Sequence, residues 1–159
     1  MEKNASLGLP NDVASWGGLT TPGIITIGSC VTLSDVSDVM AGFWSSVPYT
    51  TTGIHRTTID QDRMILAQQL LAAILNNAAF GTTPSIAFST VANDYCNGPA
   101  SAIISDANAL DSFNTSGENF NIPSTTPGFS LTTISQPQAA KSAAAPDKID
   151  WDTPGAISS

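Results

Sequence analysis

Residues 58–81 are the most strongly helical run of the chain, and they constrain its fold more than any other feature. Thr58 and Gln61 have the spacing of a capping box, and Gly81 is the expected stop. Between them, apolar residues recur at helical spacing, among them Leu66, Leu70 and Ile74. A face this broad needs contacts on several sides, so this helix is predicted to be the centre of the core.

Weaker patterns surround this helix. Residues 23–33 are β-branched and bounded by glycines, which predicts a strand with a bulge or bend at Gly28. Residues 34–44 have the apolar spacing of a short helix, capped by Ser34. Residues 45–57 read as a hydroxyl-rich loop, and residues 85–91 fit either a short strand or a helical turn.

A second helix is predicted from Gly98-Pro99 to Gly117, with proline at its first position. Its apolar residues keep helical spacing, and Asp106 and Asp111 are expected to face outward. The resulting prediction is an α+β fold with a small core of two to three helices and a few short strands.

The two ends of the chain are predicted to be extended arms. Residues 1–22 are rich in Gly, Pro and Asn, and residues 118–159 carry recurrent prolines, so the core domain is placed at 23–117. Residues 129–133 and 147–152 alternate like strands, the second with Ile149 and Trp151 on one side. The arms could dock on a neighbouring subunit or on their own core, and the candidate anchors are Trp16, Phe129, Leu131, Ile149 and Trp151.

The chain is poor in charge, with 11% charged residues against roughly a quarter in an average soluble protein. Its 19 Ser and 18 Thr predict a hydroxyl-rich surface, which suits packing against neighbours. Five scattered basic residues face 13 acidic ones, which argues against nucleic-acid binding. No apolar run reaches the roughly 18 residues of a membrane span.

Cys30 and Cys96 are the two cysteines of the chain. They are predicted to form a disulfide in an oxidising compartment, the alternative being two buried thiols. The bond would close a loop of roughly 66 residues and contribute about 4 kcal/mol. Composition and disulfide together predict an extracellular or cell-surface location. The first residues have no apolar signal region, so the export route stays open.

Three segments carry a resemblance to a known module: Gly42-Phe43-Trp44, the run from Arg63 to Asn76, and the run from Ile104 to Leu110. In this order, over residues 42–113, they resemble a module of secreted and surface-exposed prokaryotic proteins. That module has a Gly-aromatic-Trp motif and a helix reading Leu-Ala-x-Gln-Leu-x-Ala-Ala-x-Leu-Asn. It usually continues its Trp with Lys-Asn-His-Pro-Glu, whereas this chain has Ser45-Ser46-Val47-Pro48-Tyr49. The resemblance implies location and a structural role.

Residues that could carry catalysis are sparse. His55, the one histidine, lies beside Arg56, whose charge lowers imidazole basicity, so no hydrolytic triad is predicted. The pairs Asp35/Asp38 and Asp60/Asp62 lie where helix N-termini favour aspartate. We therefore predict no catalytic residue and no cofactor.

No metal site is predicted either, although calcium at Asp147, Asp150 and Asp152 is the alternative. Asn4 and Asn114 begin glycosylation sequons of the kind that a chain of this composition contains by chance.

These features lead to the hypothesis of a structural subunit of an extracellular assembly, such as a filament or surface layer. Its partners would be copies of itself, bridged by the extended arms. The alternative is a monomeric adhesion module that binds cell-surface glycans through aromatic platforms.

Overall fold

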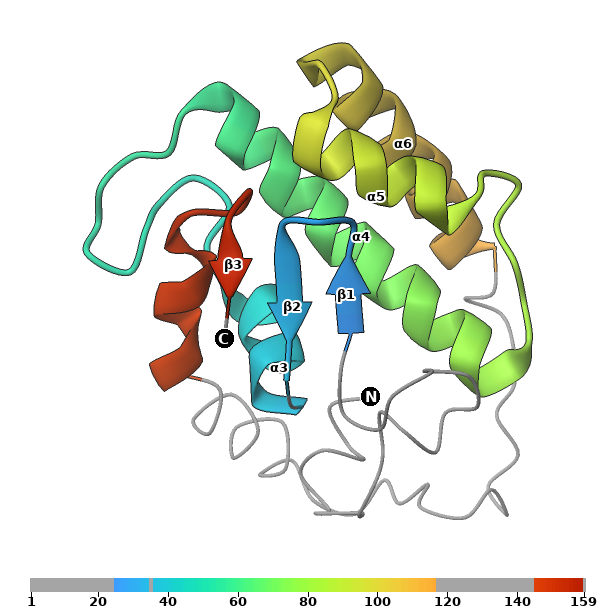
Figure 1. Cartoon of the computed structure of the whole chain (residues 1–159), viewed down its shortest axis with the longest axis horizontal. Helices are drawn as coiled ribbons and strands as arrows, with labels where there is room; N and C mark the ends of the chain where they lie inside the picture. The colour runs from blue at the N-terminus through green and yellow to red at the C-terminus, as the bar shows by residue number, and fades with distance from the viewer. Residues whose placement is uncertain (1–24, 35, 117–144, 159) are drawn as a thin grey trace.

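The computed structural model describes residues 25–34, 36–116 and 145–158. Along these residues the elements are β1 (Ile25–Ile27), β2 (Val31–Leu33), α3 (Val36–Trp44), α4 (Thr58–Phe80), α5 (Phe88–Asn97), α6 (Ala100–Thr115), the 3-10 helix η1 (Pro146–Asp152) and β3 (Ile157–Ser158). Helix α4 crosses the molecule, with α5 and α6 on one side and the strands, α3 and η1 on the other (Figure 1). The α+β prediction with a small helical core is confirmed.

The central helix forms as predicted, with its start corrected by one residue. The N-cap is Thr57, whose side chain accepts from the backbone N–H of Asp60, and Thr58 is the first helical residue. Gln61 does not close a capping box; its side chain donates to the carbonyl of Arg56 at 3.0 Å. Gly81 ends the helix in the left-handed conformation, with φ of 68°.

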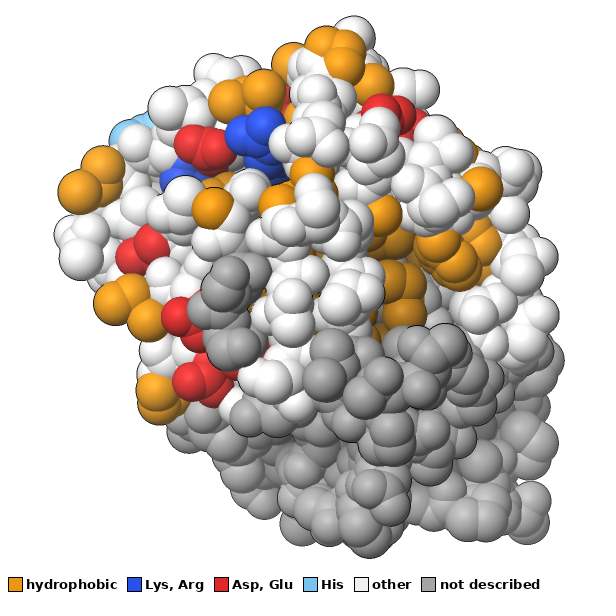
Figure 2. Space-filling model, viewed as in Figure 1, with side chains coloured by type: hydrophobic (Ala, Val, Ile, Leu, Met, Phe, Trp, Pro, Cys, Tyr) orange, Lys and Arg blue, Asp and Glu red, His pale blue; other side chains and the backbone are white. Residues whose placement is uncertain are grey.

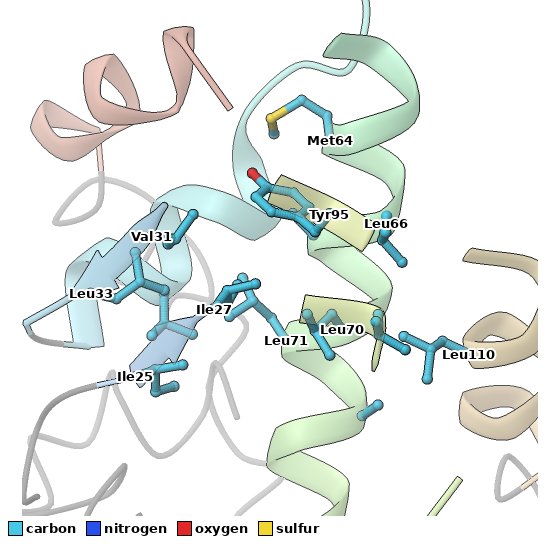
Figure 3. Close-up of a cluster of buried hydrophobic side chains, with 14 of the residues drawn as sticks. Ile25, Ile27, Val31, Leu33, Met64, Leu66, Leu70, Leu71, Tyr95 and Leu110 are labelled. Atoms are coloured by element: carbon cyan, nitrogen blue, oxygen red, sulfur yellow. The ribbon is translucent and has the colours of Figure 1, made fainter. Parts of the chain in front are cut away.

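The apolar face of α4 fills the middle of the core. Leu66 and Leu70 are fully buried, and Ile74 packs at the edge of the same cluster. Side chains from the hairpin, from α4, from Tyr95 and from Leu110 converge there (Figure 3). The helix therefore has partners on several sides, as its broad face predicts.

Residues 25–33 form an antiparallel hairpin, which corrects the prediction of one bent strand. Ile25 pairs with Leu33 and Ile27 with Val31. These four side chains are buried, and the intervening threonines are exposed. Gly28, with φ of 55°, opens the turn between the strands. β3 then adds to β2 in parallel, giving a three-stranded sheet.

Residues 85–91, predicted as either a short strand or a helical turn, lead into α5, a helix that adds to the three predicted ones. Cys96 lies in its last turn and is bonded to Cys30 in the hairpin turn, with Cα atoms 5.8 Å apart. The predicted disulfide is confirmed. It joins the hairpin to α5.

α6 begins as predicted, except that Pro99 is the N-cap and not the first helical residue. The apolar residues Ile103, Ala107 and Leu110 are buried. Asp106 is buried as well, at 6% exposure, which corrects its predicted outward orientation. Among the helices that the structure describes, none is long and apolar enough to cross a membrane.

Candidate functional site

Residues 145–158, called the C-terminal segment below, fold onto the core at a site that we call the docking site. η1 lies against α3, and β3 lies beside β2 (Figure 1). Two predictions are corrected here. The described part of the predicted arm is not extended, and the run 147–152 is a 3-10 helix and not a strand.

Trp151 is the anchor of the segment. Its side chain is completely buried, and its indole N–H donates to the carbonyl of Asp38 at 3.0 Å. The ring packs on Gly42 of α3, where an added Cβ would lie 2.6 Å from Cζ2. Trp151 is therefore packed in the core of its own chain here, and its role as an anchor between subunits stays a prediction. An indole needs both apolar contact and an acceptor when it is buried, and α3 supplies both.

Arg56 clamps the segment immediately after this anchor. Its guanidinium donates to the carbonyls of Asp152, at 2.7 Å, and of Ser46, at 3.3 Å. Its third nitrogen, Nη2, lies 3.7 Å from the Asp152 carboxylate. Burial lowers the pKa of Arg56, and the charge of Asp152 partly offsets that effect. The side chain stays charged, because an arginine pKa lies far above neutral pH.

The loop 45–57 contributes a second contact to Asp152. The backbone N–H of Thr51 donates to one carboxylate oxygen at 2.7 Å, and its hydroxyl donates to the other at 2.6 Å. The side chain of Asp152 thus binds the loop, while its backbone carbonyl accepts from Arg56.

The end of the segment is held by α5. The hydroxyl of Tyr95 donates to the carbonyl of Pro154 at 2.9 Å, and both residues are buried. Burial raises the pKa of Tyr95, so its hydroxyl keeps its proton as a donor. Arg63 donates to the Tyr95 carbonyl at 3.1 Å and holds that residue in place from α4.

Three carboxylates gather where the segment meets α3. Oxygens of Asp38, Asp147 and Asp150 lie within 4.8 Å of one another. Burial, followed by the charges of Asp38 and Asp147, raises the pKa of Asp150. Asp38 Oδ2 already accepts from the backbone and hydroxyl of Ser34, at 2.7 and 3.2 Å.

This group of carboxylates differs from the predicted calcium cluster, since Asp38 takes the place of Asp152. The three carboxylates could supply three hard oxygen ligands to a cation. Calcium takes six to eight oxygen ligands, so the cluster alone would provide only part of a calcium site.

The remaining predicted anchors fall into two groups. Ile149 on η1 is 62% exposed, whereas Trp151 is buried, so Ile149 is available at the surface. Trp16, Phe129 and Leu131 lie outside the described residues. Arg56, Tyr95 and Pro154 were not predicted, because their partners lie far away in sequence and no local pattern marks them.

The structure also shows where the residues considered for catalysis lie. His55 is exposed, with its Nδ1 2.9 Å from the Arg56 carbonyl and its ring edge-on to Tyr49. Asp60 lies in the first turn of α4 and pairs with Arg63 at 3.4 Å. Both positions fit structural roles.

No protein-family model matches the chain, and no curated protein or solved structure is significantly similar to it. The resemblance of residues 42–113 to the secreted module stays a prediction.

Proposed function

We propose that this protein is a non-catalytic structural subunit of an extracellular assembly, in which the C-terminal segment of one copy docks on the core of the next. One observation carries the proposal: the segment is bound to the core like a separate peptide. It has a buried tryptophan anchor, clamped carbonyls and a terminal strand added to a sheet edge.

The contacts of the docking site do not depend on which copy supplies the segment. Residues 117–144 separate α6 from the segment, and a run of that length could reach about 90 Å when extended. The same buried tryptophan and the same hydrogen bonds would therefore form between two copies as within one. Exchange of an identical element is a low-cost route to self-association, and open-ended exchange gives filaments.

The disulfide supports this arrangement because it braces the docking site independently of the segment. Cys30 lies in the hairpin whose strand β2 receives β3. Cys96 follows Tyr95, which holds the Pro154 carbonyl. The bond therefore keeps two walls of the site together when the segment leaves. It is also compatible with a secreted protein.

The surface supports close packing between copies. On the described part of the face in Figure 2, most of the surface is neither charged nor hydrophobic, and the few charged side chains lie mainly on its left side. Such a surface opposes association weakly. The resemblance of residues 42–113 points to the same extracellular setting.

The glycan-binding alternative has less support. Trp151, one of its aromatic candidates, is buried. Tyr49 is 47% exposed, but its ring stands edge-on against His55. This alternative predicts a monomer whose sugar binding is lost in Tyr49→Ala.

A complementation experiment tests the proposal with two full-length variants. In Gly42→Leu the docking site is blocked but the segment is intact. In Trp151→Ala/Asp152→Ala the segment is disabled but the site is intact. We expect the wild type to form concentration-dependent multimers, each variant alone to stay monomeric, and the mixture to give a one-to-one complex by native mass spectrometry.

A wild type that stays monomeric at every concentration, together with a mixture that forms no complex, would overturn the proposal. Circular dichroism of each variant provides the folding control. The double variant Gly42→Leu/Trp151→Ala is the matched negative partner, since it has neither an open site nor a working segment.

A further inference from the structure

The corner between α5 and α6 contains a pair of aspartates that the docking site does not use. Asp94 lies in the last turns of α5, and Asp106 faces it from α6. Asp106 is 6% exposed, and its Oδ2 is buried without a hydrogen-bond partner. A buried carboxylate oxygen without a donor is costly, so it requires a physical explanation.

Asp94 lies within hydrogen-bonding reach of the Asp106 carboxyl, yet two ionised carboxylates can only accept. One proton removes the conflict. With the proton on Asp106, its hydroxyl donates to Asp94 and the repulsion between the two side chains disappears. The side-chain amide of Asn93 donates to Oδ1 of Asp94 at 3.4 Å, so Asp94 already acts as an acceptor.

A short and closely packed connection joins the two helices that carry the pair. Gly98 packs on Asp94 so closely that an added Cβ would lie 2.6 Å from the Asp94 carbonyl oxygen and 2.8 Å from its Cα. The Gly98 N–H also donates to that carbonyl at 2.8 Å. Helix α5 ends at Asn97 and α6 begins at Ala100, so the connection between the two helices is short.

Few other charges bear on the pair. The charged residues of the elements packed against α6 are Asp60, Asp62 and Arg63 on α4 and Asp94 on α5, and α6 itself carries Asp111. Of these, Asp94 is the charge that acts on Asp106. Arg63 is engaged with Asp60 and with the Tyr95 carbonyl.

We propose that Asp94 and Asp106 share one proton and form a pH-sensitive latch between α5 and α6. While Asp106 is protonated, its side chain donates to Asp94 and the two helices are held together. Loss of the proton leaves two carboxylates that repel each other, which weakens the contact between α5 and α6. This property goes beyond assembly through the C-terminal segment, since the hydrogen bonds that hold the segment use neither residue.

The direction of the pH effect follows from the cause. Burial, followed by the charge and the hydrogen bond of Asp94, raises the pKa of Asp106 above its ordinary value of 3.8. The folded protein then binds more protons than the unfolded chain between these two values. The contribution to stability is complete below the ordinary value, and it is lost as pH rises through the raised one.

The test uses the full chain in an Asp150→Asn background. The pKa of Asp150 is also raised, so its ionisation would likewise lower the stability as pH rises. Carbon-13 NMR of the carboxyl groups follows each aspartate directly. We expect Asp106 to titrate above its ordinary value of 3.8. In Asp94→Asn, where an amide donates to an ionised Asp106, its titration should shift downward.

Thermal unfolding supplies the second readout. Asp106→Asn keeps a donor toward Asp94 without the charge. The Tm of this variant should therefore fall less than that of the parent as pH rises from 3.8 through the raised pKa of Asp106. A titration of Asp106 at or below the ordinary value would overturn the proposal, as would an unchanged fall in Asp106→Asn. Calcium that raises the Tm at neutral pH in the parent, but not in Asp106→Asn, would assign the pair to a cation instead.

Discussion

Gly42 and Trp151 lie in such close contact that the space for a Cβ on α3 is occupied by the indole ring. The two residues are more than a hundred positions apart in sequence, and their contact defines where the C-terminal segment docks. Gly42 is one of the residues that carry the resemblance to the secreted module, and here it serves packing.

Gly42→Ala is expected to destabilise the protein by about 1–3 kcal/mol, because the added methyl group would lie 2.6 Å from Trp151 and 2.9 Å from Leu71. Urea denaturation measures this change. Gly155→Ala is the matched control, since its Cβ would sit 3.6 Å from Arg63, an ordinary contact distance. Equal stabilities of the two variants would contradict the packing argument.

Arg56→Met is expected to lower the free energy of unfolding by about 2 kcal/mol, because it removes charge-assisted bonds to two backbone carbonyls. Arg56→Lys keeps the charge but cannot reproduce the two bonds of the planar guanidinium, so a partial loss is expected. Denaturant titration of both variants separates charge from geometry. A neutral effect of Arg56→Met would mean that the clamp adds nothing to docking.

Removal of the disulfide by Cys30→Ser/Cys96→Ser should cost about 4 kcal/mol, as expected for cysteines 66 residues apart. Denaturation of the wild type with and without reductant gives an independent measure. Reductant should have no effect on the double variant, which controls for other actions of the reagent. If the wild type unfolds at the same midpoint in both conditions, the bond does not stabilise the core.

Asp150→Asn is expected to stabilise the protein at neutral pH. Burial and the neighbouring carboxylates of Asp38 and Asp147 raise the pKa of Asp150, so its ionisation opposes folding. The wild type should lose stability as pH rises from 3.8 through the raised value, and the variant should lose less. Asp111→Asn, an exposed substitution on α6, is the control for a general charge effect. Parallel pH profiles for wild type and Asp150→Asn would contradict the assignment.

Asn114 is expected to remain unmodified in the folded protein although it begins a sequon. Its side-chain nitrogen, the atom that glycosylation would modify, donates to the carbonyl of Gln69 at 2.9 Å and to its side chain at 2.8 Å. Mass spectrometry of the secreted protein checks this expectation. A glycan at this site would show that modification precedes the packing of α6 on α4.

The features that were predicted are those encoded by neighbours in sequence. The spacing of apolar residues over 58–81 specified α4, and Gly98-Pro99 marked the start of α6. The hairpin was missed because a central glycine indicates a bend as readily as a turn. Only the observed pairing of the two strands shows that Gly28 lies in a turn, in the left-handed conformation. The 3-10 helix at 146–152 was read as a strand because a six-residue alternation is too short to define a period.

The sequence alone determined the α+β class, the central helix and the disulfide partners, because each depends on local pattern or on there being two cysteines. Only the tertiary structure decided the position of the C-terminal segment. Trp151 is buried because α3 presents a bare glycine and the carbonyl of Asp38 together, and Arg56 meets Asp152 only when their loops are folded. The same holds for Asp106, whose helical position looks exposed until α5 covers it with a second carboxylate. Such sites are formed by residues that are distant along the chain, and local periodicity carries no information about those pairings.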